Sequence, residues 1–284
     1  YAPKAEYQKI TTGTADSQLE MTRKLELSYD EFRKLEAYAR SLGLEVFSTP
    51  FDMESIDFLA SEKQKVWKIP SGELTNLPYL EKIASLPIEG KSVVISTGMA
   101  TIEEIKDALS VLEKNGMKKE DITILHCNTE YPTPYEDVNL NAFYQLKTLF
   151  SDYNLGFSDH SVGYFAGLAA VPYGITFIEK HFTLDKNFEG PDHKASVTPE
   201  ELKLLCEGIR AVEKSLGSSE KIVTVSEAKN KIVARKSIIA ARPIKKGETY
   251  TTENLTTKRP GNGISPMRWY DILGKDAEMD FEED

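Results

Sequence analysis

Cysteine is scarce in this sequence, and long apolar runs are missing. Cys127 and Cys206 are the only thiols among 284 residues, and each lies in an apolar stretch. Two such residues are typical of buried cysteines in a reducing compartment and argue against a disulfide framework. No stretch approaches the roughly 18 apolar residues of a membrane-spanning helix, and the first residues show no signal-peptide pattern. We therefore expect a cytoplasmic protein with no membrane partner.

Positive charge is also in short supply. The chain has 35 Lys and Arg against 45 Asp and Glu, which leaves a net charge of −10. A nucleic-acid-binding protein normally shows a basic excess, so this balance argues against a nucleic-acid partner. A small anionic substrate is still compatible, because a few lysines, serines and backbone N–H groups can bind phosphate within an acidic protein.

Helical and strand-like segments alternate between residues 28 and 216. We expect helices over residues 28–42, 55–63, 77–86, 102–115, 140–150, 164–171 and 199–216. We expect strands over residues 44–50, 66–70, 92–97, 122–127, 155–158 and 175–181. Alternation at this spacing indicates βαβ units and a parallel sheet.

The count of these units favours a (β/α)8 TIM barrel, an α/β fold, over residues 1–217. Each of the six expected strands is followed by a helix, and the series begins with a helix that has no strand before it. A closed barrel has eight strands and eight helices, so we expect the first two strands to be absent from this chain. An open doubly wound sheet is the alternative, but no glycine-rich phosphate fingerprint follows any strand.

The last part of the chain has a different pattern. Residues 218–234 are polar and charged, and their composition indicates a linker. Short strands are expected over residues 237–241 and 255–257, with a turn between them and a short helix near 267–273. We therefore expect a separate, small β-rich domain over residues 235–284.

Polar residues gather where the expected strands end, which is where barrel enzymes carry their active sites. His160 and His181 end consecutive strands. Because neighbouring parallel strands lie about 4.8 Å apart, two imidazoles placed there can converge on one metal ion. Imidazole suits Mn, Fe, Co or Zn, and two histidines leave positions open for water and substrate. The alternative is that these are hydrogen-bonded structural histidines.

Lys68 interrupts an otherwise apolar strand. A buried lysine is costly unless it is paired or used, so it is a candidate cation for a phosphate or carboxylate, or a Schiff-base nucleophile. It could instead pair with Glu73 or Glu179. Glu73 is a candidate general base, or a carboxylate placed at a helix start.

Three serines that end strands could donate hydroxyls to an anion, although serine at such a junction is more often a helix cap. They are Ser71, Ser96 and Ser158. Far along the chain, Arg259 lies in a stretch that by composition is a surface turn.

Taken together, these junction motifs resemble those of the bacterial N-acetylneuraminate (sialic acid) synthase family. The matching stretches are FSTPFD (47–52), KIPSGE (68–73), ISTGM (95–99), residues 126–134, GFSDHS (156–161), EKHFT (179–183), GPDH (190–193) and RPGNG (259–263). The last of these is similar to the antifreeze-like (SAF) domain of that family. One departure is that Asn128 stands one residue before the position, Thr129, where some relatives carry asparagine.

The resemblance implies a reaction and a set of roles. Such enzymes condense phosphoenolpyruvate with N-acetylmannosamine, giving N-acetylneuraminate and phosphate, with His160 and His181 binding Mn²⁺ or Mg²⁺. By the family pattern, Lys68 and the three serines hold phosphoenolpyruvate, and Thr49 lines the site. Glu73, Tyr131 and Asp192 contact the amino sugar. A domain-swapped homodimer would bring Arg259 of one subunit over the site of the other. The family also begins with two strands that carry a Glu and a Lys, and this chain starts after both.

Three rival interpretations stay open. A sister synthase of the legionaminic acid type, acting on a different amino sugar, shares nearly every motif. A Schiff-base aldolase would use Lys68 covalently. A binding protein for ice or glycan would rely on the C-terminal domain alone, but it would have no need of polar strand ends.

Overall fold

The computed structural model describes residues 3–13 and 15–284, which form two compact units that divide after Gly217. Residues 1, 2 and 14, which belong to the expected barrel domain, lie outside the described part of the chain.

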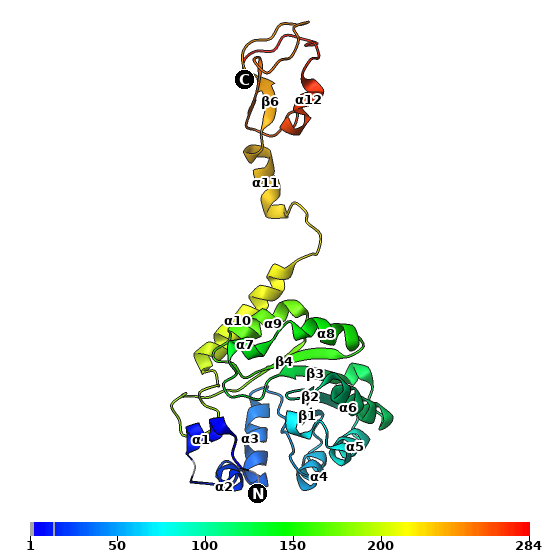
Figure 1. Ribbon diagram of the computed structural model, residues 1–284, viewed down its shortest axis with the longest axis vertical. Coiled ribbons are helices and arrows are strands. Elements are labelled where there is room, and N and C mark those ends of the chain that lie inside the picture. The colour runs from blue at the N-terminus through cyan, green and yellow to red at the C-terminus, as the bar shows by residue number, and fades with distance from the viewer. Residues whose placement is uncertain (1–2, 14) are drawn as a thin grey trace. The chain divides into compact units, whose positions relative to one another are not determined.

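A curled sheet of five parallel strands forms the centre of the first unit (Figure 1). The strands are β1 (Val66–Ile69), β2 (Ser92–Ser96), β3 (Ile122–Cys127), β4 (Asn154–Asp159) and β5 (Phe177–Lys180). They lie side by side in chain order. A doubly wound sheet reverses its strand order at a switch point, whereas a β/α barrel adds each strand beside the last. The order therefore confirms the barrel class, of which this sheet is about half.

Strands β1 to β4 are largely buried, whereas β5 is half-buried. Trp67, Ile95 and Ile122 are fully buried in one core cluster together with residues of the surrounding helices. Parallel sheets normally show such continuous apolar runs, since helices pack on one face and side chains fill the barrel interior on the other. A polar residue within one of these strands is then an exception that needs a partner.

Helices connect the strands, and several begin at a capping residue. The helices between and after the strands are α5 (Leu77–Ser85), α6 (Ile102–Lys114), α7 (Tyr135–Val138), α8 (Ala142–Leu149), α9 (Phe165–Ala170) and α10 (Pro199–Leu216). Thr101 and Thr198 each accept a backbone hydrogen bond from a glutamate three residues later, Glu104 and Glu201. These capping boxes explain why α6 and α10 start where the sequence predicts.

Four helices precede the first strand. They are α1 (Glu6–Thr12), α2 (Gln18–Arg23), α3 (Tyr29–Ser41) and α4 (Met53–Ser61). The expected helix over 28–42 is α3, and the one over 55–63 is α4. Helices α1 and α2 were not expected, because each is too short to show a clear apolar period.

The strand expected over residues 44–50 is wrong. This segment has no regular secondary structure, because its backbone does not pair with β1. The backbone N–H of Ser48 donates to Gln64 Oε1 at 2.7 Å, and Gln64 Nε2 donates to the carbonyl oxygen of Ser48 at 2.9 Å. A side chain thus occupies the backbone groups that a strand ladder would need.

The second unit is built on an antiparallel pair, β6 (Ser237–Ala240) and β7 (Leu255–Lys258). The turn η4 (Pro266–Arg268) and helix α12 (Trp269–Ile272) follow, and the small core contains Ala240, Ile244, Leu255 and Ala277. The segment expected as a linker contains helix α11 (Val225–Ala234), whose Ile232 carbonyl accepts from the backbone N–H of Gly261 at 2.7 Å. Among the described residues, none of the helices has the length and apolar character that a bilayer crossing requires.

Candidate functional site

A lysine, a serine and a glutamate meet where β1, β4 and β5 end. Ser158 and Glu179 are paired in register on β4 and β5, so their side chains leave the same face of the sheet. Ser158 Oγ donates to Glu179 Oε1 at 2.8 Å, and Lys68 Nζ lies 3.2 Å from the same oxygen. Lys68 is buried, only 6% exposed. The sequence offered either Glu73 or Glu179 as a partner for Lys68, and the structure pairs Lys68 with Glu179.

Glu179 was not among the predicted site residues, although it lies at the centre of this cluster. The sequence suggested it only as a structural partner for Lys68. Its position two residues before His181, at the end of an expected strand, was the available signal, because residues two apart on a strand share a face.

His160 is buried beside this cluster, and its Nδ1 is held by a backbone carbonyl. Its Nδ1 lies 2.6 Å from the carbonyl oxygen of Asn128, which can only accept, so Nδ1 carries the proton. Its Nε2 lies 3.2 Å from Ser158 Oγ. Since the single hydroxyl proton of Ser158 is donated to Glu179, the Nε2 lone pair is not consumed. Burial lowers the pKa of His160 to about 4, so the ring is neutral at physiological pH.

His181 lies against His160 as the strand order predicted. The two ring centroids are 5.2 Å apart and the rings are perpendicular. His181 Nδ1 is 3.7 Å from Asp192 Oδ2. Burial lowers the pKa of His181 and raises the pKa of Asp192, so both groups are pushed toward their neutral forms. Across the described ranges, no three His, Cys, Asp or Glu side chains form a metal-binding group.

The other two histidines have different surroundings. His126 Nε2 contacts the carbonyl oxygen of Val138 at 2.8 Å, and its ring packs against Phe143 and Phe157. It therefore faces the helices, because strand residues alternate between the two faces of the sheet. His193 Nδ1 is 2.8 Å from Thr183 Oγ1.

A second group of small polar residues lies at the ends of β2 and β3. Ser71 Oγ accepts from the backbone N–H of Gly98 at 3.0 Å and lies 3.3 Å from Cys127 Sγ. It therefore contacts the next strand end, while Pro70 takes the capping position of the turn η1 (Ser71–Glu73). Ser96 is buried, and its Oγ has no hydrogen-bond partner within the described residues. A buried hydroxyl in that state favours a bond to a ligand atom.

Gly98 is the point where these groups approach most closely. A Cβ added there would lie 2.6 Å from Thr129 Cγ2 and 2.8 Å from Ser71 Oγ. We expect Gly98→Ala to lower the free energy of unfolding by about 1–3 kcal/mol through overpacking. Urea denaturation measures the loss. Gly72→Ala is the matched control, because nothing lies within 4 Å of its added Cβ; equal destabilisation of both variants would contradict the close approach at Gly98.

Tyr131 lies over both histidines. Its ring centroid is 4.0 Å from that of His160 and 5.3 Å from that of His181. Burial raises the pKa of Tyr131, so its hydroxyl keeps its proton and is available as a donor. The structure thus brings Tyr131, Asp192 and the two histidines together on one side of the Lys68–Glu179 pair.

Three predicted site residues have no described contact with the two histidines or with the Lys68–Glu179 pair. Thr49 is partly buried in the irregular segment before α4. Glu73 lies in η1 and accepts from Asn76 Nδ2 at 2.6 Å. Arg259 is exposed in the second unit, in the turn that follows β7.

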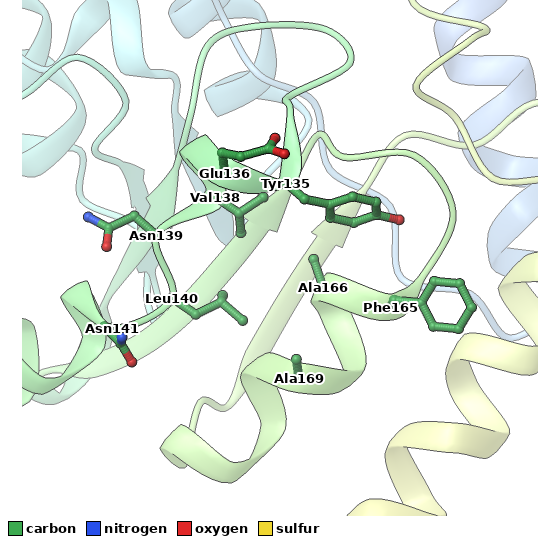
Figure 2. A pocket seen from close by; sticks show the side chains of 9 residues that line it. All are labelled: Tyr135, Glu136, Val138, Asn139, Leu140, Asn141, Phe165, Ala166 and Ala169. Atoms are coloured by element: carbon green, nitrogen blue, oxygen red, sulfur yellow. The ribbon is translucent and has the colours of Figure 1, made fainter.

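A pocket lies away from the strand ends, on the helix side of the sheet (Figure 2). It measures about 490 Å³ and lies between α7, the segment that follows it, and α9. Figure 2 shows Val138, Leu140, Ala166 and Ala169 at its centre. None of the predicted site residues lines it, so the chemistry of this protein is better sought at the strand ends.

Known proteins match most or all of this chain. N,N'-diacetyllegionaminic acid synthase of Campylobacter jejuni is 52% identical over 283 residues, covering 100% of this chain and 84% of that protein. The enzyme of the same name from Legionella pneumophila is 42% identical, over 97% of this chain and 77% of that protein. Among solved structures, the N-acetylneuraminic acid synthetase of Leptospira borgpetersenii superposes with a TM-score of 0.68 at 32% identity, covering 75% of this chain and 72% of its own.

Family profiles divide the chain as its fold does. Residues 235–284 match the SAF domain, the antifreeze-like module expected from the RPGNG stretch. Residues 1–221, which include all five parallel strands, match the NeuB family. With that match over most of the chain and the long, highly identical relatives beside it, this chain belongs to the NeuB family.

Proposed function

We propose that this protein is a synthase of the legionaminic acid type, which condenses phosphoenolpyruvate with an amino sugar and releases phosphate. The observation that carries the proposal is the 52% identity to N,N'-diacetyllegionaminic acid synthase over all of this chain. The sialic acid synthetase with a solved structure is only 32% identical. N-acetylmannosamine, the sugar that the motifs first suggested, is therefore the less well supported substrate.

The relatives' product defines the class of sugar. A nonulosonate has nine carbons, and phosphoenolpyruvate supplies three of them, so the acceptor is a six-carbon aldose. The name of the product carries two acetyl groups on nitrogen, so we propose an aldose with two acetamido groups. The junction motifs could not separate this sugar from N-acetylmannosamine, because phosphate, carboxylate and aldehyde are common to both reactions.

The Lys68 cluster suits the anionic substrate. A buried ammonium interacts more strongly with a phosphate or carboxylate than an exposed one does, because little water screens it. We assign Lys68, together with the hydroxyls of Ser71, Ser96 and Ser158, to hold phosphoenolpyruvate. The orphaned Ser96 hydroxyl supports this assignment.

The reaction then needs two bonds to form and one to break. The enol carbon of phosphoenolpyruvate attacks the aldehyde carbon, whose oxygen takes up a proton. Water adds to the resulting oxocarbenium centre and gives up a proton in return. The tetrahedral intermediate expels phosphate by cleavage of its C–O bond, which leaves the keto acid. Glu179, held by Lys68 and Ser158, is the carboxylate in this cluster that can accept the proton of the attacking water.

The two histidines fit a divalent metal ion, for which we propose Mn²⁺ or Mg²⁺. His160 is neutral, its proton is fixed on Nδ1 by the Asn128 carbonyl, and its Nε2 lone pair is free. That arrangement, in which one ring nitrogen donates to a carbonyl and the other is left to bind, is the usual one for histidine ligands. His181 would supply the second nitrogen. When bound, the ion would polarise the aldehyde oxygen of the sugar.

We further propose that the protein is a domain-swapped homodimer in which Arg259 reaches the site of a second copy. Support comes from the resemblance of the RPGNG stretch and from the exposed position of Arg259 in its turn. Sedimentation of the full-length protein measures the oligomeric state directly.

Phosphate release by the full-length protein tests the proposed function. With phosphoenolpyruvate and Mn²⁺, we expect kcat/KM for the diacetamido aldose to exceed that for N-acetylmannosamine by about 100-fold, because a site built to bond a substrate group discriminates against a sugar that lacks it. EDTA should abolish release, and Mn²⁺ should restore it. A preference for N-acetylmannosamine would restore the sialic acid assignment. Release that is indifferent to EDTA would contradict the role of the two histidines.

A further inference from the structure

Helix α1 places an aromatic residue beside the candidate site. Tyr7 lies in its first turn, and the Tyr7 and Tyr131 ring centroids are 5.1 Å apart with the planes inclined at 31°. Tyr131 in turn packs on His160 and His181. The four rings form a continuous aromatic row that begins at α1, drawn in dark blue in Figure 1, and ends at the two histidines.

The charges around Tyr7 are negative. Burial, and after it the charge of Asp192, raises the pKa of Tyr7 to about 12, and Glu130 acts in the same direction. The Tyr7 hydroxyl therefore keeps its proton. It accepts from Gln8 Nε2 at 3.2 Å, so its own proton is free for another acceptor.

Asp192, whose charge acts on Tyr7, carries a hydrogen-bond acceptor to which no described residue donates. Asp192 Oδ1 is buried and has no hydrogen-bond partner in the described part of the chain. Buried carboxylate oxygens are normally bonded, so this atom favours a ligand that brings hydroxyl or N–H donors. The carboxylate of Glu130 would repel a phosphate or a carboxylate. The end of the row at Tyr7 thus suits a neutral ligand with hydroxyl and amide groups.

We propose that Tyr7 is a specificity-determining residue that contacts an acetamido group of the sugar. The inference rests on the proposed function, since it takes an amino sugar as the substrate. The aromatic face packs against the acetamido methyl group, and the hydroxyl donates to the acetamido carbonyl oxygen. A tyrosine suits both tasks because it has an apolar ring and a polar end. Lys68 and its serines hold the anionic substrate elsewhere in the site.

A purely structural role for Tyr7 makes a different prediction. In that case the ring would only fix α1 against Tyr131. Lys4 also ties this segment together, because its buried ammonium donates to Thr12 Oγ1 at 3.0 Å and to the carbonyl oxygen of Gly13 at 3.1 Å. Loss of a structural anchor would change the affinity for both substrates or the stability of the protein. Loss of a sugar contact changes only the KM and kcat/KM for the sugar.

Steady-state kinetics of full-length variants separates the two roles. In Tyr7→Phe, we expect the KM for the sugar to rise about 3- to 10-fold, the effect of one lost neutral hydrogen bond, while the KM for phosphoenolpyruvate stays unchanged. In Tyr7→Ala, we expect kcat/KM for the sugar to fall by about 10- to 100-fold, and the preference between sugars with one and two acetamido groups to shrink. Ile10→Ala is the control, because Ile10 is 78% exposed on the same helix.

The proposal is overturned if Tyr7→Phe leaves the KM for the sugar unchanged, or if the KM for phosphoenolpyruvate rises by the same factor. Tyr7→Phe keeps the ring, so it tests the proposal even where Tyr7→Ala fails to fold. The wild-type protein is assayed in parallel with both sugars. A wild type that prefers N-acetylmannosamine sinks the legionaminic assignment, but Tyr7 is then judged by the KM for that sugar, so the two failures are distinguishable.

Discussion

Lys180→Met is expected to lower the free energy of unfolding of the first unit by about 3–5 kcal/mol, because it leaves a buried carboxylate without its counter-ion. Lys180 Nζ lies 3.1 Å from Asp159 Oδ2, and both side chains are almost fully buried, at 3% and 0% exposure. The ammonium also donates to the carbonyl oxygen of Ser161. Burial lowers the pKa of Lys180, and the charge of Asp159 opposes that shift.

The double variant Asp159→Asn with Lys180→Met is the control. It removes both charges, while the amide introduced by Asp159→Asn keeps an oxygen for the backbone N–H and hydroxyl of Ser161. In the wild type these two groups donate to Asp159 Oδ1 at 2.9 and 2.6 Å. Replacing a whole buried pair is often nearly neutral, so we expect the double variant to recover most of the loss.

Urea denaturation, followed by tryptophan fluorescence, measures these free energies. Trp67 is buried in the first unit and Trp269 lies in the second, so a Trp269→Phe background reports the first unit alone. An equal loss in the single and double variants would contradict the ion-pair explanation.

Acid is expected to destabilise the metal-free protein through His160. Its pKa falls from 6.5 to about 4 on folding because the ring is buried. Between these values the unfolded chain binds a proton that the folded protein excludes. Stability is therefore fully present above pH 6.5 and is lost as the pH falls toward 4. At about 1.4 kcal/mol per pKa unit, the loss through this residue amounts to about 3 kcal/mol.

His160→Gln isolates this contribution. With EDTA present, urea midpoints are measured from pH 8 to pH 4 for the wild type and the variant. The wild type should lose stability more steeply between pH 6.5 and 4, because the variant has no proton to bind at this position. The slope is the readout, so a constant destabilisation of His160→Gln does not affect it. Parallel curves would show that His160 titrates normally in the folded protein.

The sequence predicted the barrel class well because its signals are local. Capping residues such as Ser28, Thr101 and Thr198 mark helix starts, and apolar runs such as 92–97 mark buried strands. The false strand at 44–50 shows the limit of that reasoning. Its residues have strand character, but a strand exists only where a partner offers backbone groups, and here Gln64 takes those of Ser48.

In the candidate site, too, the sequence predicted some contacts and missed others. Strand ends were enough to predict that His160 and His181 lie close together, because consecutive strands of a barrel are neighbours. Strand ends were not enough to show that Glu179 accepts from Ser158 and pairs with Lys68. Such a contact joins residues far apart in the chain, and its existence depends on sheet curvature and side-chain direction.

By itself, the sequence determined the alternation of strands and helices over residues 66–216, the polar strand ends and the change to a small C-terminal domain. Periodicity and capping act within a few residues, so they can be read from the chain directly. Only the tertiary structure decided which polar groups form hydrogen bonds or ion pairs with one another. It placed Glu179 between Lys68 and Ser158, fixed the His160 proton on Nδ1, buried Asp159 with Lys180 and brought Tyr7 to Tyr131. Those contacts set the energies on which the chemistry depends, since burial removes the water that would otherwise screen each charge.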